Sequence, residues 1–162
     1  MYITGPSVIK EVTGEEITSE ALGGVESHAH YSGVVHFVAE DDQDAIAITR
    51  RLLSFLPSNN TEDPPFRPEL WEERMVADES LDSVIPEDPR EPYDMHEVIR
   101  RVVDRADFME VQSQYAANLI VGFGRLGGRT VGVIANQPMV KAGALDIDSS
   151  DKGSRFIRFC NA

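Results

Sequence analysis

Apolar residues concentrate most strongly in the stretch from 118 to 138, NLIVGFGRLGGRTVGVIANQP. Two runs rich in β-branched and apolar residues, 119–124 and 130–135, flank Gly127 and Gly128. Glycine adopts the positive φ values that tight hairpin turns require, so this stretch predicts a strand, a turn and a returning strand. Neither run alternates cleanly between apolar and polar residues. This predicts cover on both faces of the hairpin and therefore a layered α/β domain.

The apolar spacing elsewhere predicts helices and two short extended segments. In the first part of the chain we expect a helix from Pro6 to Gly14 and a helical turn near Ser19, Leu22 and Gly23. A third helix is opened by Asp41 and Asp42, and its apolar face carries Ala45, Ile48, Leu52 and Phe55. Later in the chain we expect a helix capped by Asp94, with Met95, Val98, Ile99 and Val102 buried, and a last helix capped at residues 149–151, which carries Phe156, Ile157, Phe159 and Cys160. The expected extended segments are residues 1–4 and 108–111. Cys160 lies on the apolar side of the last helix and is expected to be a small core residue.

Residues 57–94 differ abruptly in composition from the rest of the chain. They contain seven of the nine prolines and twelve Asp or Glu residues, so they can bury little surface. Phe66, Leu70, Trp71, Leu81, Val84 and Ile85 are the side chains of this stretch that could dock on neighbouring surface. A connector of this length is improbable inside one compact domain, which predicts a boundary between two domains here.

Charge and cysteine content narrow the functional classes. The formal net charge of −13 argues against binding nucleic acid or an anionic membrane through a broad basic face. The single cysteine, Cys160, fits a reducing compartment. No signal peptide is recognisable in MYITGPSVIKEV, and no apolar run approaches the ~20 residues of a membrane span, so a cytoplasmic location is expected.

His28, His30 and His36 lie close together in the sequence, beside Glu26. On a strand, an H-x-H pair directs both rings to one face, and imidazole binds zinc. No second dense group of ligands is present to complete such a site. Local hydrogen bonds that organise this loop are therefore the favoured interpretation, and metal binding is the alternative.

Gly122, Gly124, Gly127 and Gly128 superficially resemble a phosphate-binding loop. No helix follows them, and neither G-K-[ST] nor a correctly spaced G-x-G-x-x-G is present. We therefore attribute them to turn formation and close packing. No Ser–His–acid arrangement stands out either, so no catalytic residue is assigned.

Two amides, Asn136 and Gln137, follow the second apolar run directly. They are expected at the carboxyl end of a strand, where open α/β sheets commonly build sites. The favoured alternative is that both amides tie down the turn before Pro138, because amides often form turns.

Several stretches of the chain resemble a single protein family. They are YITGPSVIKEVTGEEIT, SGVVH, LLSFLPSNN, ANQP and GALDIDSSDKGSRFIRFCNA. Together they are similar to the middle of the carboxyltransferase β chain of acyl-CoA carboxylases, of the propionyl-CoA carboxylase and methylmalonyl-CoA carboxyltransferase or decarboxylase type. The resemblance covers nearly the whole chain, and only the connector departs from it.

The resemblance implies an α/β, crotonase-like (ClpP/crotonase) fold in two parts. Residues 1–56 would be the C-terminal part of the N-terminal carboxyltransferase domain, 57–92 the connector, and 93–162 the N-terminal part of the C-terminal domain. Acyl-CoA would bind mainly to the N-terminal domain of one subunit. Carboxybiotin, carried by a biotin carboxylase or biotin carboxyl carrier subunit, would approach the C-terminal domain of the facing subunit. Because the two substrates would meet between two copies of the subunit, a homo-oligomer is expected. No metal is implied.

The same resemblance places Asn136, Gln137, Gly143 and Ala144 near the biotin side, as substrate-binding residues. Carboxyl transfer in the family passes through a thioester enolate and a biotin ureido anion, held by backbone N–H groups at glycine-rich segments. Both segments are expected to lie outside these 162 residues, one before Met1 and one after Ala162. Loss of one oxyanion donor costs roughly 10²–10³ in rate, so the chain alone is expected to be inactive.

The leading hypothesis is therefore part of a biotin-dependent carboxyltransferase that acts on a short-chain acyl-CoA, most naturally propionyl-CoA. One alternative is the α chain of a methylmalonyl-CoA decarboxylase. Another, of a different class, is a non-catalytic assembly or interaction module derived from such a subunit. Exposed sheet edges and unburied apolar stripes would promote association in that case.

Overall fold

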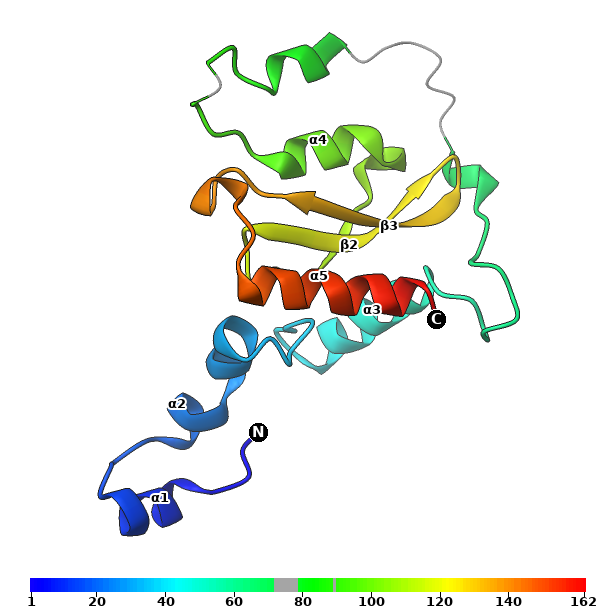
Figure 1. Cartoon of the computed structure of the whole chain (residues 1–162). Coiled ribbons are helices and arrows are strands. Elements are labelled where there is room, and N and C mark those ends of the chain that lie inside the picture. The colour runs from blue at the N-terminus through cyan, green and yellow to red at the C-terminus, as the bar shows by residue number, and fades with distance from the viewer. Residues whose placement is uncertain (72–78, 89) are drawn as a thin grey trace.

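The computed structural model describes residues 1–71, 79–88 and 90–162. Its centre is an antiparallel sheet in the order β1-β2-β3, with helices on both faces (Figure 1). The strands are β1 (Met109–Val111), β2 (Leu119–Leu126) and β3 (Arg129–Asn136). The predicted hairpin and the short strand before it are both confirmed.

The hairpin turn depends on two glycines in the left-handed region. Gly127 has φ 58° and Gly128 has φ 75°. Both backbone N–H groups donate to the carboxylate of Asp104, over 3.2 and 2.7 Å. A side chain at Gly122 would collide with the backbone oxygen of Met109 on β1. Turn formation and close packing therefore account for these glycines, as the sequence indicated.

One face of the sheet is covered by α4 (Met95–Val102), which begins at the predicted cap, Asp94. Ile99 and Val103 pack with Ile120 of β2 in a buried cluster. Val102 was expected in this stripe, but 51% of its surface is exposed, so that prediction is wrong. The helix ends at Val102, and the chain then turns the side chain of Val103 inward.

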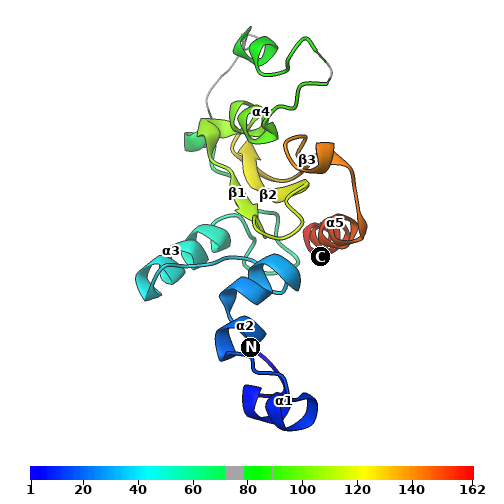
Figure 2. The same cartoon turned by 90° about the vertical axis from the view of Figure 1, so that its left-hand side faces the viewer.

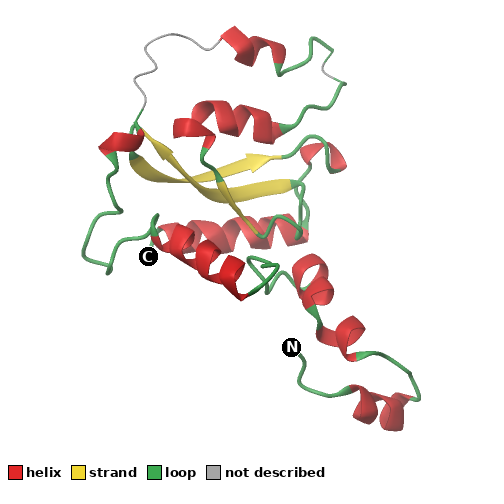
Figure 3. Ribbon diagram, turned by 180° about the vertical axis from the view of Figure 1, so that it is seen from behind, coloured by secondary structure: helices red, strands yellow, loops and turns green. Residues whose placement is uncertain are grey.

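The opposite face is covered by α3 (Asp42–Leu53) and α5 (Ile147–Cys160) (Figures 1 and 3). Its core contains seven buried side chains from both sides of the connector: Phe55, Met109, Val111, Leu119, Val121, Phe123 and Phe156. The rings of Phe55 and Phe123 are stacked with centroids 5.9 Å apart. β2 is therefore buried on both faces, as expected. β3 is not, since Ile134 is 43% exposed, and the prediction of full cover is wrong for this strand.

Two predictions about α5 also need correction. The helix is capped by Asp146 rather than within residues 149–151, because the Asp146 carboxylate accepts the N–H of Ser149 and the Ser149 hydroxyl accepts the N–H of Asp146. Cys160 is exposed and is not a core residue. It lies over Gly132 at the helix end, where β3 leaves its outer side open.

Residues 1–31 form an arm that extends away from the sheet (Figure 2). It contains α1 (Pro6–Thr13), α2 (Ser19–Gly23) and a π-helical turn, Ser27–Tyr31. Both α-helices are as predicted, and Gly14 ends α1 with φ 77°. Residues 1–4 form no strand, so that prediction is wrong. None of the three described strands pairs with this segment.

The connector is partly docked on the hairpin. Phe66 forms a β-bridge with Arg129, and the backbone N–H of Arg67 donates to the oxygen of Gly128 over 2.8 Å. Short 3₁₀ turns follow at Pro68–Leu70 and Glu79–Ser83. The docking expected for Phe66 is therefore present, whereas the division of the chain into two partial domains stays a prediction.

Among the described residues, no helix combines the length and apolar character that crossing a membrane would require.

Replacing Phe55 tests whether the segment before the connector belongs to the core of the sheet. Phe55 is 1% exposed, and we expect Phe55→Ala to lower the free energy of unfolding by about 3–5 kcal/mol, since it removes a buried ring. The control Phe66→Ala removes a ring that is 53% exposed and should cost less than about 1 kcal/mol. Urea denaturation followed by circular dichroism measures both, and equal losses would contradict this assignment of the core.

Candidate functional site

The predicted site residues meet in the turn that follows β3. The carbonyl of Gln137 accepts the N–H of Val140 over 3.0 Å, and the carbonyl of Val140 accepts the N–H of Gly143 over 2.9 Å. A Cβ atom on Gly143 would lie 2.6 Å from Nδ2 of Asn136, so the two residues are in close contact. The structure thus brings Asn136, Gln137, Gly143 and the adjacent Ala144 together at the carboxyl end of the strand.

Three consecutive residues of this turn lie in the left-handed region: Lys141 at φ 50°, Ala142 at φ 53° and Gly143 at φ 70°. Such a conformation costs a non-glycine residue about 1–3 kcal/mol, and it persists only when the surroundings impose it. Strain of this kind clusters at functional sites. Only Gly143 is marked by its residue type, so the sequence could not reveal the other two.

Asn118 fixes one end of the turn. Its side chain is 1% exposed, and Nδ2 donates to the carbonyl of Ala144 over 2.7 Å. Its own carbonyl accepts the N–H of Gln137 over 2.9 Å. Lys141 pairs with Asp146, and this ammonium group holds the pKa of the carboxyl well below its usual range.

Gln137 fixes the other end. Its side chain is 5% exposed, and Oε1 accepts the N–H groups of Met95 and Met139 over 3.2 and 3.3 Å. Nε2 donates to the carboxylate of Asp94 over 2.7 Å. The alternative interpretation, that this amide ties down the turn, is confirmed for Gln137. Asn136 is exposed, and substrate binding by these residues stays a prediction.

His96 lies beside this amide, between two carboxylates. Its Nδ1 is 2.8 Å from Asp94 and its Nε2 is 2.8 Å from Glu110 of β1. Burial of the ring lowers the pKa of His96, but the bonds to Glu110 and Asp94 outweigh it, and the pKa lies above its usual value. Burial likewise raises the pKa of Asp94, yet the hydrogen bonds from Gln137 and His96 leave it below its usual value.

A buried lysine organises the loop before β2. Lys152 of α5 is 1% exposed, and its Nζ donates to the carbonyls of Gln112, Tyr115 and Ala116 over 2.9, 2.8 and 3.4 Å. Burial lowers the pKa of its ammonium group to about 8. Lys152 was not singled out from the sequence. Its position four residues before Phe156, on the same helix face, was the available signal.

The loop that Lys152 binds also contacts the segment before α3, through hydrogen bonds and ring packing. The N–H of Gln112 donates to the carbonyl of His36 over 2.9 Å, and its side-chain amide donates to the carbonyl of Gly33. The ring of Tyr115 packs so closely on Gly33 that any side chain there would collide with it. Lys152 of α5 is thus connected, through this loop, to Gly33 and His36, which lie more than a hundred residues earlier in the sequence.

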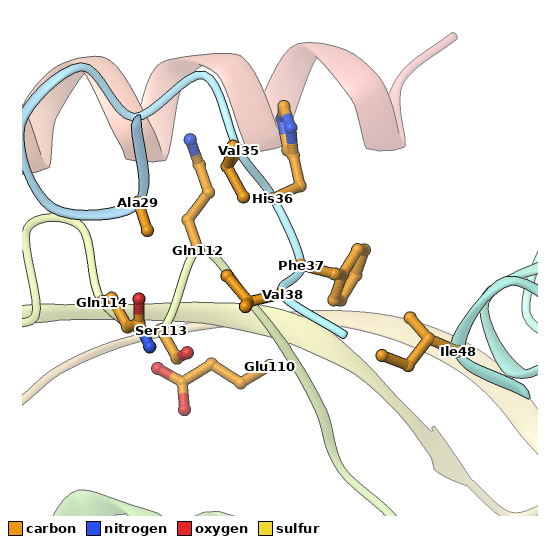
Figure 4. Close-up of a pocket in the computed structure, with 10 residues that line it drawn as sticks. All are labelled: Ala29, Val35, His36, Phe37, Val38, Ile48, Glu110, Gln112, Ser113 and Gln114. Atoms are coloured by element: carbon orange, nitrogen blue, oxygen red, sulfur yellow. The ribbon is translucent and has the colours of Figure 1, made fainter. Parts of the chain in front are cut away.

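Two hollows border His36 and Phe37, in the segment before α3. The first, of about 150 Å³, places the carboxylate of Glu110 near Ser113 and Gln114, opposite Ala29 and residues 35–38 (Figure 4). It is smaller than the roughly 300 Å³ at which ligand pockets begin. The second, of about 430 Å³, is mainly apolar and reaches Phe156 and Arg155 of α5. Neither contains the residues of the turn after β3.

The histidine-rich segment is used for local hydrogen bonds, as favoured. Nδ1 of His28 is 2.8 Å from the hydroxyl of Ser32, and Nε2 is 2.6 Å from the carbonyl of Met1. His30 lies 3.5 Å from Glu26. The segment is helical rather than extended, so the strand geometry assumed for a metal site is wrong. Within residues 1–71, 79–88 and 90–162, no three His, Cys, Asp or Glu side chains are grouped to hold a metal ion.

Comparison with known proteins then assigns the chain to a family. The profile of the carboxyl transferase domain matches residues 1–162, the whole chain. The chain belongs to the carboxyl transferase domain family. This confirms the resemblance drawn from the ITGP, ANQP and GALDIDSSDKG stretches.

Relatives in the family are similar in sequence to this chain over all or nearly all of its length. The α subunit of methylmalonyl-CoA decarboxylase from Veillonella parvula is 55% identical over 162 residues, which are 100% of this chain and 32% of that protein. The β5 subunit of a biotin-dependent acetyl-/propionyl-coenzyme A carboxylase from Mycobacterium tuberculosis is 52% identical over 167 residues, covering 99% of this chain and 30% of that protein. This chain therefore spans about a third of the length of these relatives.

The fold matches a solved carboxyltransferase. The crystal structure of transcarboxylase 12S, a hexamer with hydrolysed methylmalonyl-coenzyme A bound, superposes with a TM-score of 0.94 at 48% identity. The overlap covers 99% of this chain and 31% of the transcarboxylase chain. The expected mixed helix-and-sheet, crotonase-like carboxyltransferase fold is confirmed at this level.

Replacing Lys152 tests its role in the loop. We expect Lys152→Met to lower the free energy of unfolding by about 2–4 kcal/mol, because three buried carbonyl groups lose their shared donor. Lys10→Met is the control, since the side chain of Lys10 is 63% exposed, and it should change stability by less than about 0.5 kcal/mol. Chemical denaturation measures both. A loss below 1 kcal/mol for Lys152→Met would contradict the proposed role.

Proposed function

We propose that this chain is part of a biotin-dependent acyl-CoA carboxyltransferase, which moves a carboxyl group between carboxybiotin and a short-chain acyl-CoA, propionyl-CoA being the favoured substrate. The observation that carries the proposal is the family match over residues 1–162. The relative that acts on methylmalonyl-CoA, the carboxylated form of propionyl-CoA, supports the acyl group. The name of the mycobacterial relative supports biotin.

Within this function, the turn after β3 is the proposed biotin side. It combines an exposed amide at Asn136, the close contact of Gly143 with that amide, and backbone strain at Lys141 and Ala142. Biotin arrives on a carrier protein, so its site has to be accessible from outside. An exposed turn at the carboxyl end of a strand meets that requirement.

The described residues supply framework rather than reacting groups. Gln137 and Lys152 are engaged with partners inside the fold, and no Ser–His–acid arrangement is formed by the histidines. We infer that the backbone donors that hold the enolate and the ureido anion come from other parts of the subunit. The 162 residues alone are then inactive.

The direct test is biotin-dependent decarboxylation of methylmalonyl-CoA, in which the propionyl-CoA released is measured. We expect turnover by the whole subunit that carries these residues and none above background by the 162-residue chain at equal concentration. Omission of biotin is the control and should abolish turnover. Turnover by the isolated chain would contradict the framework role, and a whole subunit that is inactive with biotin and any short-chain acyl-CoA would refute the proposed activity.

Exposed apolar side chains favour a second role, in assembly. On the arm, Ile3 and Val12 are 106% and 78% exposed, and on α5 Ile147 and Ile157 are 83% and 56% exposed. Two such apolar regions on a protein of net charge −13 favour association with another protein surface over association with an anionic one. The transcarboxylase match is itself a hexamer.

Light scattering coupled to size exclusion tests this role on the 162-residue chain. We expect a mass above the 18.0 kDa of one chain, rising with protein concentration. The double variant Val12→Ser/Ile157→Ser should shift the distribution toward single chains, because it makes each apolar region more polar. A single-chain mass for the unaltered protein at every concentration would rule this role out.

A further inference from the structure

The strained turn after β3 and the polar network beside α4 share one residue, Gln137. The main chain of Gln137 begins the turn by accepting the N–H of Val140, and its side chain enters the network. The turn holds Lys141 and Ala142 in a conformation that their own residue types disfavour. Whatever fixes the Gln137 side chain therefore helps to impose that conformation.

The orientation of the Gln137 amide is set by charge. Nε2 faces the carboxylate of Asp94 at 2.7 Å, whereas Oε1 faces the N–H groups of Met95 and Met139. A flipped amide would direct its oxygen at a carboxylate and its NH₂ group at two N–H donors. Asp94 therefore selects one orientation, and its own position depends on the groups that bind it.

His96 lies between Asp94 and a second carboxylate, Glu110. Both ring nitrogens lie 2.8 Å from carboxylate oxygens, Nδ1 from Asp94 and Nε2 from Glu110. A neutral imidazole has only one N–H, so only the imidazolium form can donate to both. Among the described residues, the polar groups that contact the ring are these two carboxylates, from the start of α4 and from β1, and the uncharged amide of Gln137. Lys152 of α5 acts on Glu110 through its charge.

We propose that His96 is a positioning residue which, as the imidazolium ion, fixes Asp94 and Gln137 and thereby holds the left-handed turn Lys141–Gly143 against Asn136. This rests on the proposed function only where the turn is taken as the biotin side. The positioning itself is a property of the fold.

Loss of the proton rearranges the network. Without N–H at Nδ1, two acceptors face each other at 2.8 Å, the ring nitrogen and the Asp94 oxygen. Nε2 of Gln137, 3.0 Å from Nδ1, can then donate to the ring instead of to Asp94. Because the pKa of His96 is raised in the folded chain, its stabilising contribution is complete below the usual value of 6.5 and is lost as the pH rises through the folded value.

Amide hydrogen exchange in the 162-residue chain tests the positioning role without any catalytic assay. The reporters are the N–H groups of Gly143 and Ala144, which donate to Val140 and Lys141 over 2.9 and 3.1 Å. After correction for intrinsic rates, we expect their protection to fall about tenfold between pH 5.5 and 8.5, in step with the ring signals of His96. Protection that stays constant while His96 titrates would overturn the proposal.

Two variants sharpen this measurement. His96→Gln should show the low protection at every pH, with no step. His28→Gln is the matched control, because His28 bonds to Ser32 and Met1 in the arm, and it should keep the step. If His96→Gln fails to fold, the titration of the unaltered chain still decides. A step that persists in folded His96→Gln would assign it to another group and overturn the proposal.

Kinetics of the whole subunit separate this inference from the proposed function. We expect His96→Gln to raise the KM for the biotin substrate about tenfold and to leave the KM for acyl-CoA within about twofold, since only the biotin side is loosened. If exchange shows the loosened turn but the KM for biotin is unchanged, the turn is not the biotin side, while the positioning role of His96 stands. If exchange shows no loosening, His96 has no positioning role, whatever the activity.

Discussion

The arrangement of the whole chain depends on burying β2 on both faces. A strand with apolar residues at successive positions cannot lie at a surface, so it needs one layer above and one below. Ile120 points to α4, while Val121 and Phe123 point to the aromatic cluster that includes Phe55. The second layer is therefore assembled from chain that precedes the acidic connector and chain that follows the hairpin. Residues far apart in the sequence are held together because this strand requires them both (Figure 1).

Burial of this strand brings polar groups inside, and they are satisfied mainly by backbone. Lys152 carries a charge into the interior and gives its protons to carbonyls of the loop before β2. Arg125, 4% exposed, donates to the carbonyl of Ser54 at the end of α3 and lies 4.1 Å over the ring of Phe55. A buried polar group with several partners tolerates few alternative arrangements, since each alternative leaves donors or acceptors unpaired. Apolar packing thus joins the two parts of the chain, and these contacts specify how they are joined.

The sequence was sufficient wherever local chemistry determines structure. Asp41 and Asp94 cap helices where predicted, because an Asp side-chain oxygen directly before a helical apolar pattern accepts a free backbone N–H of the first turn. It was insufficient where the outcome depends on what lies opposite. Cys160 belongs to an apolar helix face and lies over Gly132 of β3, yet it is exposed at the last position of the helix. In the site, the amides of the turn could be located from their place after a strand. The left-handed Lys141 and Ala142 could not, because their conformation is imposed by Asn118 and Gln137.

Strain and charge meet at the turn after β3 for a common physical reason. A turn that side chains disfavour relaxes unless its surroundings hold it, and a network of ionised groups holds more firmly than neutral hydrogen bonds do. The cost is that such a network depends on the protonation of His96. Glycine at Lys141 or Ala142 would remove the strain without any such network. The strained residues lie next to the exposed amide of Asn136, so the network that holds the turn also fixes the surroundings of that amide.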